Sequence, residues 1–418
     1  MRRAGPRLVL ALGLVLGVAT LAYQSLTQAG KFAIDFQVYY YAARASLAGD
    51  AMYAASPPAF PAFGYVYPPV TVVAFYPFAL VDDWLVSFAL FAALKLVAGI
   101  ALALLLVRTV ERFGPSLSRV DEVLVGGYVL LSIHSVVPQF YGETNLPLAF
   151  ALAVGFVALE RGDEGRSGVA FGLAALVKVF PAGVGLWLLR RRSWRAVGAA
   201  VATGGGLLAL GVPLFGLDVT RTWLFDAVLP RLRHDAFAGG LAPEATYFTL
   251  RRPLSVLGVD PSLLPVFAAV MLAPVVAYCY RDLRTPTDRL VGAYVTLVAV
   301  LLFFPTYFVY FPLLFFPLVP LLYLLEGRAR RLFLAGALVT DLPLTLGSVR
   351  RFLDLVSAPT GVRPPVLAAA EPVFTLGTPL LWGCLLTLAG CVCHVRRTAD
   401  APEPSGTAEG RPSGLDRR

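Results

Sequence analysis

Apolar runs recur from the beginning of this chain to its end, and they leave few folds open to it. The runs cover residues 8–26, 84–107, 123–137, 146–159, 168–189, 196–217, 263–280, 290–304, 311–325, 332–346 and 373–395. Several are long enough to cross about 30 Å of hydrocarbon as helices, and the shorter ones borrow flanking residues. We therefore expect an all-α, polytopic integral membrane protein with about 10–12 transmembrane helices.

The composition agrees with a membrane protein. Hydrophobic residues make up 58% of the chain and charged residues 15%, whereas a soluble protein carries about a quarter of charged residues. No stretch has the composition of a soluble catalytic domain, so we assign residues 1–398 to one membrane domain. Residues 399–418, rich in Pro, Gly, Ser and charge, are predicted to form a disordered cytoplasmic tail. The N-terminal run lacks an A-x-A cleavage site after Leu26 and is interpreted as an uncleaved first span.

Basic residues account for the net charge of +9, and they cluster between the apolar runs. This distribution is the one that the positive-inside rule predicts for cytoplasmic loops, and it argues against nucleic acid as a partner. If successive loops are to alternate between the cytoplasmic and the outer side, the run at 68–81 must stay within the first outer loop. The run at 168–189 must turn back at Pro181, because Arg166 and Arg190 both belong inside. Irregular backbone at that depth is tolerated where it lines a protein cavity.

Three predicted outer segments, 27–69, 215–261 and 350–372, hold most of the remaining polar side chains. The densest group is in the first segment and comprises Asp35, Tyr39, Tyr40 and Arg44. The composition predicts a helix over 36–48 that Gly49 ends. A spacing of four residues puts Asp35 and Tyr39 on one face. Asp35 then has two compatible interpretations, as the N-cap of this helix or as a general base at the lip of a cavity.

Further polar residues lie in turns or within apolar runs. Tyr67 precedes two prolines that open a short helix, and a structural role explains it. Glu143 and Asn145 occupy a predicted outer turn, where an ionisable Glu143 must face protein or water. A lysine at mid-membrane costs about 2.5–3.5 kcal/mol, so Lys178 is a functional hypothesis. Lys95 poses the same question without an accompanying polar motif, and an unidentified carboxylate is a candidate partner.

The second outer segment carries His234, Arg251 and Arg252. Either they decorate a solvated loop, or they bind a phosphate-bearing ligand through bidentate guanidinium contacts. Tyr307 and Tyr310 precede a late span, where interfacial tyrosine belts are common. Cysteines near residue 391 lack a second ligand pair at zinc-like spacing, so we predict no metal. The sequence contains no nucleotide-binding glycine loop, and we predict no cofactor.

Four short motifs appear in order along the chain: Asp35-Phe-x-Val-Tyr-Tyr with Ala-Ala-Arg44, Tyr67-Pro-Pro69, Gly142-x-x-Asn145 and Lys178-x-x-Pro181. In this order the chain resembles the family 87 glycosyltransferases of the GT-C superfamily, which are polyprenyl-phosphate-mannose-dependent mannosyltransferases and their relatives. Two positions depart from the family pattern. Glu143 replaces the usual Gln, and residues 305–311 lack the His often found there, for which His234 is a substitute.

The resemblance implies a GT-C-like bundle in the cell membrane that transfers a hexose, with mannose expected, from a polyprenyl-phosphate sugar to a lipid or glycan acceptor. It implies an extracytoplasmic site and an inverting single displacement, with Asp35 as base and Lys178, Arg251 and Arg252 near the phosphate. The remaining substrate-binding candidates are Tyr39, Tyr40, Arg44, Tyr67, Glu143, Asn145, His234, Tyr307 and Tyr310. Membrane lipids are the other expected partners. A flippase or transporter of lipid-linked glycans, and more narrowly a polymerase, remain alternatives.

Overall fold

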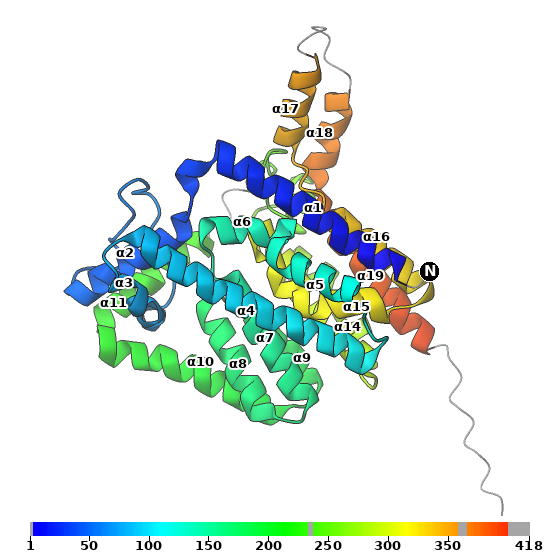
Figure 1. The fold of residues 1–418 in the computed structure, drawn as a ribbon, viewed down its shortest axis with the longest axis horizontal. Coiled ribbons are helices and arrows are strands. Elements are labelled where there is room, and N and C mark those ends of the chain that lie inside the picture. Colours follow the sequence, from blue (N-terminus) through cyan, green and yellow to red (C-terminus); the bar gives the residue numbers. More distant parts are fainter. Residues whose placement is uncertain (1–2, 233–236, 358–365, 400–418) are drawn as a thin grey trace, which may run out of the picture.

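The computed structural model describes residues 3–232, 237–357 and 366–399, and these residues form helices and no strands (Figure 1). The first part of the chain forms α1 (Ala4–Thr27), η1 (Ala29–Lys31), α2 (Ile34–Ala48), η2 (Pro69–Phe75), α3 (Tyr76–Ala79), α4 (Trp84–Phe113), α5 (Arg119–Leu131), α6 (Ile133–Tyr141), α7 (Asn145–Glu160), α8 (Glu164–Val177), η3 (Phe180–Gly183), α9 (Val184–Arg190) and α10 (Trp194–Phe215). The all-α expectation is confirmed.

The second part continues with α11 (Leu217–Thr222), η4 (Trp223–Val228), η5 (Leu229–Leu232), α12 (Arg251–Ser255), α13 (Leu264–Cys279), α14 (Pro286–Phe303), η7 (Phe308–Leu314), α15 (Phe315–Leu324), α16 (Gly327–Thr340), α17 (Leu346–Ser357), α18 (Val366–Leu376) and α19 (Pro379–Ala399). Figure 1 shows α17 and α18 projecting from the body as a helical hairpin, and they cover most of the third predicted outer segment. The predicted disordered tail beyond Ala399 lies outside the described residues.

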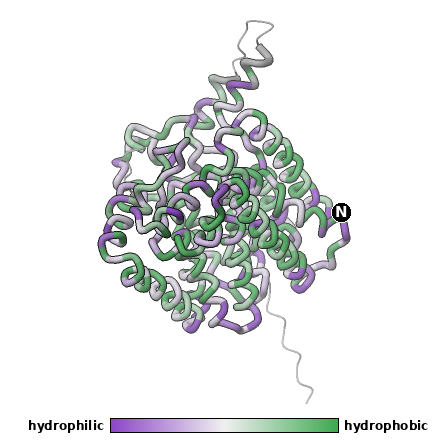
Figure 2. The backbone as a smooth tube through the Cα atoms, turned by 60° about the vertical axis from the view of Figure 1, so that its left-hand side comes forward, coloured by the Kyte–Doolittle hydropathy of each residue, from purple (hydrophilic) through white to green (hydrophobic). Residues whose placement is uncertain are grey.

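Six of the described helices are long and apolar enough to cross a membrane, namely α1, α4, α5 with α6, α10, α14 and α19. The helices α7 and α13 and the stretch Phe308–Leu324 are apolar but shorter. The protein is therefore a polytopic membrane protein, as predicted, although several segments of its bundle fall short of a full span. In Figure 2 the long helices are mostly hydrophobic, and the hydrophilic residues gather at the turns.

Ion pairs at one end of the bundle join segments that are far apart in the sequence. Asp121 at the start of α5 binds Arg7 of α1 at 2.8 Å, and Glu160 at the end of α7 binds Arg289 of α14 at 2.6 Å. At the same end, Arg397 of α19 lies 3.0 Å from Glu326, which precedes α16. We call this the arginine-rich end. It gathers the basic clusters that the sequence assigned to the cytoplasm.

The segment between α7 and α10 turns back within the bundle, as predicted. Gly168 and Gly172 of α8 pack against Ala196 and Ala200 of α10, so the two helices run in parallel. At the near end, Glu164 accepts hydrogen bonds from the amides of Arg195 and Ala196 at 3.1 and 3.2 Å. Two parallel consecutive helices require the intervening chain to return, and η3 and α9 provide that return. The break begins at Lys178, which is extended (φ −135°, ψ 133°), three residues before the predicted Pro181.

An aromatic layer covers the opposite end of the bundle. Phe36 of α2 stacks on Phe91 of α4 with centroids 5.1 Å apart, and Phe78 meets the Phe91 ring edge-on at 5.3 Å. The helix α2 ends at Gly49 with a left-handed φ of 80°, as the sequence predicts. The run predicted to remain in the first outer loop is η2 with α3, which packs on α2. This layer positions the candidate site.

Candidate active site

Asp35 lies in the first turn of α2, one residue inside its start. The N-cap position is occupied by Ala33, whose φ of 56° is left-handed, and no side chain caps the helix. The N-cap interpretation of Asp35 is therefore wrong. The Ala33 amide instead donates to the carbonyl of Phe140 at 2.9 Å, which ties the start of α2 to the turn before α7.

Gly142 brings that turn close to α2. Its φ is 83°, and a Cβ at this position would lie 2.6 Å from the Cβ of Phe36. Only glycine combines a left-handed conformation with so close an approach. The next residue, Glu143, is thereby held beside the first turn of α2.

Glu143 forms a buried ion pair with Lys178. The Lys178 Nζ lies 2.5 Å from the Glu143 Oε2, and the two side chains are 3% and 11% exposed. The Lys178 Nζ also lies over the ring of Tyr310, 4.5 Å from its centroid. The break after α8 thus delivers Lys178 to the turn before α7, and Tyr310 covers the pair.

Two tyrosines from the first outer segment complete the wall on the α2 side. The hydroxyls of Tyr39 and Tyr67 lie 3.2 Å apart, and the Tyr67 carbonyl accepts a hydrogen bond from Tyr53 at 2.7 Å. Tyr39 packs on Phe75 of η2 with centroids 4.6 Å apart. Since Tyr39 follows Asp35 by one helical turn, the two side chains share a face of α2.

The Asp35 carboxylate, outside the membrane-spanning helices, is strongly perturbed. Burial and, to a smaller extent, the Glu143 carboxylate raise the pKa of Asp35 to about 8, against the opposing effect of Lys178 and Lys95. Within the described part of the chain, no side chain or amide donates a hydrogen bond to this carboxylate. An acid with a pKa near neutrality and a free oxygen suits proton transfer.

Lys95 is the residue of this cluster that sequence reasoning undervalued. It is 1% exposed, and its Nζ donates to the Gln139 carbonyl at 3.2 Å. The rings of Phe88 and Phe91 lie 5.3 and 5.2 Å from the Nζ. Among the described residues no carboxylate lies within ion-pairing distance, so the suggested pairing is wrong. The unfavourable placement of a lysine inside a span was the signal available in the sequence.

Lys95 also faces a cavity of about 480 Å³. The cavity opens among α1, α4 and α6, and its lining is otherwise almost wholly apolar. It consists of Leu21, Ser25, Ala29, Phe32, Phe88, Ala92, Lys95, Leu130, Leu131, Val136, Gln139 and Phe140. A single cation at one side of an apolar cavity is suited to a ligand with a charged head and a hydrocarbon chain.

Other predicted site residues lie elsewhere. The Tyr40 hydroxyl donates to the Asp82 carbonyl at 2.7 Å, and Arg44 donates to the Tyr40 hydroxyl at 2.9 Å. Both side chains therefore fasten α2 to the loop before α4. Asn145 is buried and donates to the Val309 carbonyl at 2.6 Å. Tyr307 packs on Tyr247 with centroids 4.4 Å apart, and His234 lies outside the described residues.

The two predicted arginines of the second outer segment also differ from expectation. Arg252 is completely buried and donates only to backbone carbonyls, including those of Ala245 at 2.5 Å, Pro243 at 3.0 Å and Phe374 at 2.9 Å. These bonds occupy the guanidinium, so its assignment to the carrier phosphate is contradicted. Arg251 is buried with its guanidinium 5.1 Å from the centroid of the Phe303 ring.

Comparisons with known proteins identify the family of this chain. The profile of glycosyltransferase family 87 matches residues 65–305, more than half of the chain. The chain belongs to glycosyltransferase family 87. The matched region contains Tyr67, Lys95, Glu143 and Lys178, and it begins after Asp35.

A more particular likeness is to the polyprenol-phosphate-mannose-dependent alpha-(1-2)-phosphatidylinositol pentamannoside mannosyltransferase of Mycolicibacterium smegmatis. The two are 28% identical over 289 residues, which cover 66% of this chain and 65% of that protein. The aligned part is thus just under two thirds of the relative. No solved structure matches the chain with significance.

Proposed function

We propose that this protein transfers mannose from a polyprenyl-phosphate carrier to a lipid-linked glycan. The observation that carries the proposal is that the Asp35 carboxylate interacts electrostatically with Glu143, Lys178 and Lys95, and that Lys95 borders the apolar cavity. Membership of family 87 supports glycosyl transfer, and the name of the mycobacterial relative supports this donor class.

Asp35 is the general base in the proposed reaction. Its carboxylate takes the proton of the acceptor hydroxyl while that oxygen forms a bond to the anomeric carbon of the sugar. The bond from the anomeric carbon to the carrier phosphate breaks, and its electron pair leaves with the phosphate. One displacement at one carbon inverts the anomeric configuration. The paired hydroxyls of Tyr39 and Tyr67 are placed to hold the sugar or the acceptor.

Lys95 is the proposed contact of the carrier phosphate. Lys178 is already neutralised by Glu143 at 2.5 Å, whereas Lys95 faces the apolar cavity with a carbonyl as its hydrogen-bond acceptor. A phosphate there compensates the buried ammonium, and the first isoprene units occupy the apolar walls. This replaces the assignment of Arg252 made from the sequence.

The proposed site faces the extracytoplasmic side. Positive-inside orientation puts the arginine-rich end in the cytoplasm. The helix α1 runs from that end toward Asp35, and α7 runs back to it from Glu143, so Asp35 and Glu143 lie at the other end of the bundle. Single-cysteine labelling in intact cells tests this. A cysteine at Asp50 should react with an impermeant reagent, and one at Arg119 should react only after permeabilisation. The reverse pattern contradicts the orientation.

The site also separates an enzyme from a transporter. A transporter places its polar groups around the midplane between repeats, whereas Asp35 and Glu143 lie just past the ends of α1 and α6, next to a layer of aromatic side chains. Glycosyl transfer needs polar groups at only one side of the membrane.

Purified protein in liposomes with radiolabelled polyprenyl-phosphate mannose and extracted membrane lipids tests the activity. Asp35→Asn should lower turnover by about 10²–10⁴-fold, because the base is lost while shape and folding are kept. The matched control is Asp50→Asn, an exposed acid at the end of α2, which should transfer at the wild-type rate. Near-wild-type transfer by Asp35→Asn would end the proposal for this residue.

A further inference from the structure

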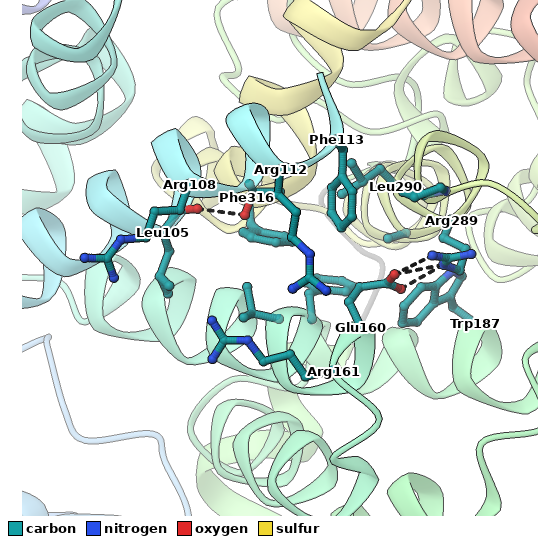
Figure 3. A pocket seen from close by; sticks show the side chains of 15 residues that line it. Leu105, Arg108, Arg112, Phe113, Glu160, Arg161, Trp187, Arg289, Leu290 and Phe316 are labelled. Atoms are coloured by element: carbon teal, nitrogen blue, oxygen red, sulfur yellow. Dashed lines mark hydrogen bonds and ion pairs between the residues drawn. The ribbon is translucent and has the colours of Figure 1, made fainter. Parts of the chain in front are cut away.

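A second pocket lies at the arginine-rich end (Figure 3). Asp35 lies at the opposite end of the bundle. Its walls come from α4, α7, α9, α14 and α15 and include Leu105, Phe113, Phe156, Trp187 and Phe316. Its polar lining consists of Arg108, Arg112, Arg161, Arg289 and Glu160, with Thr109. The pocket therefore combines apolar aromatic walls with an excess of positive charge.

Some of this charge is already balanced. Glu160 is bound at 2.6 Å by Arg289 and at 2.6 Å by Arg191. Arg289 also donates to the Arg284 carbonyl at 2.6 Å, so its guanidinium has little capacity left. Arg191 lies over the ring of Trp187, 4.7 Å from its centroid. These contacts hold Glu160, Arg289 and Arg191 in place at the pocket. Because Arg289 and Arg191 already balance the negative charge of Glu160, this carboxylate does not balance the other arginines.

Arg108, Arg112 and Arg161 are not balanced in this way. Among the residues that the structure describes, no carboxylate lies within ion-pairing distance of any of the three. Figure 3 shows Arg112 and Arg161 on one side of Glu160 and Arg289 on the other. Neighbouring guanidinium groups repel one another, and a phosphodiester relieves this repulsion through bidentate hydrogen bonds.

The surface next to the pocket indicates where such a phosphate comes from. Val97, Ile100 and Leu104 are 64%, 44% and 51% exposed, and they follow one another at helical spacing along α4 toward Arg108. In a membrane these side chains face hydrocarbon. A hydrocarbon chain lying along them places its head group at Arg108 and Arg112, a geometry that a free phosphate does not use.

We propose that this pocket binds an anionic glycerophospholipid of the leaflet at the arginine-rich end. Arg112 and Arg161 bind its phosphate, with Arg108 adding charge, and one acyl chain lies along the exposed face of α4. The site is separate from the transferase site. Its occupancy joins α4 to the end of α7, next to the Glu160–Arg289 ion pair that joins α7 to α14.

Lipid binding to the full-length protein in neutral detergent tests the proposal, with native mass spectrometry as the readout. Wild-type protein should retain phosphatidylglycerol more tightly than phosphatidylcholine. Arg112→Gln should weaken phosphatidylglycerol binding about fivefold, and Arg112→Gln with Arg161→Gln about 25-fold. The matched control is Arg119→Gln with Arg328→Gln, which removes two exposed charges from the same end outside the pocket and should bind as wild type.

Three results overturn the inference. One is equal binding by the pocket variant and the control variant, which indicates attraction by general charge. Another is equal retention of phosphatidylcholine. The third is full displacement of the lipid by millimolar inorganic phosphate, which indicates a site for free phosphate. If the double variant does not fold, the single variants Arg112→Gln and Arg161→Gln decide among the same outcomes.

Discussion

The Nζ of Lys178 lies 2.5 Å from the Oε2 of Glu143, so a buried ion pair joins the break after α8 to the turn before α7. Neither partner has another oppositely charged group at comparable distance among the described residues. Each charge therefore depends on the other.

Lys178→Met should destabilise the protein by about 3–5 kcal/mol, because it leaves the Glu143 carboxylate uncompensated in a buried site. The double variant Glu143→Gln with Lys178→Met should recover much of that loss, since neither charge remains. Unfolding in detergent is measured for the wild type, for the single variants Lys178→Met and Glu143→Gln, and for the double variant. Additive losses in the double variant would show that the two residues act independently.

Transfer should depend on pH through Asp35. Burial and the Glu143 carboxylate raise the pKa of Asp35 to about 8, and only the deprotonated form accepts the acceptor proton. For wild-type protein kcat/KM should therefore rise about tenfold per pH unit below pH 8 and level off above it. Rates measured from pH 6 to 9.5 test this, and a profile that is flat between pH 6 and 8 would contradict Asp35 as the base.

Lys95→Met should fold normally and use the donor poorly. After its removal the Gln139 carbonyl still accepts a hydrogen bond from the Gly142 amide at 3.2 Å, and no carboxylate is left unpaired, unlike the loss of Lys178. Loss of a charge-assisted contact to phosphate costs about 1.5–3 kcal/mol, which corresponds to about 10–150-fold in kcat/KM for the donor. Titration of the donor at fixed acceptor measures the effect, and Lys95→Arg should restore part of it. Unchanged donor kinetics would remove Lys95 from the site.

Gly142→Ala should lower both stability and transfer. The left-handed φ of 83° costs an alanine about 1–2 kcal/mol, and its Cβ would also push against Phe36 and displace Glu143 from α2. Gly162→Ala is the matched control, because its φ is 82° and no atom lies within 4 Å of the added Cβ. The control should lose stability alone. Equal transfer by the two variants would show that the approach of Gly142 to Phe36 does not position the site.

The sequence predicted the parts of the site that are costly to bury. Glu143 and Lys178 lie in or beside apolar runs, where an ionisable group must find a partner, and this requirement brings them together. The end of α2 followed from Gly49 in the same local way, whereas its start at Ile34 did not follow from Asp35 as an N-cap. These predictions depend on interactions between residues close in the sequence, or on the free-energy cost of placing a charged side chain in hydrocarbon.

Side-chain direction was harder to predict. Tyr40 and Arg44 lie in the same motif as Asp35, yet the helix turns them toward the loop at Asp82. Arg252 was expected to meet phosphate because an outer arginine attracts anions, but folding of the second outer segment surrounds it with carbonyls. Lys95 is the opposite case, a site residue that the sequence did not single out. Its neighbours in the sequence give no sign of the cavity that α1 and α6 form around it.

The return of the chain between α8 and α10 has a consequence for topology mapping. Reporter fusions placed at Asp163 and at Arg192 should give the same side, because both positions lie at the arginine-rich end. If the apolar run at 168–189 is counted as one membrane crossing, every later loop is assigned to the wrong side of the membrane. The sidedness of the whole C-terminal half, including Tyr310, therefore depends on the break at Lys178, where α8 stops, and on the return of the chain through η3 and α9.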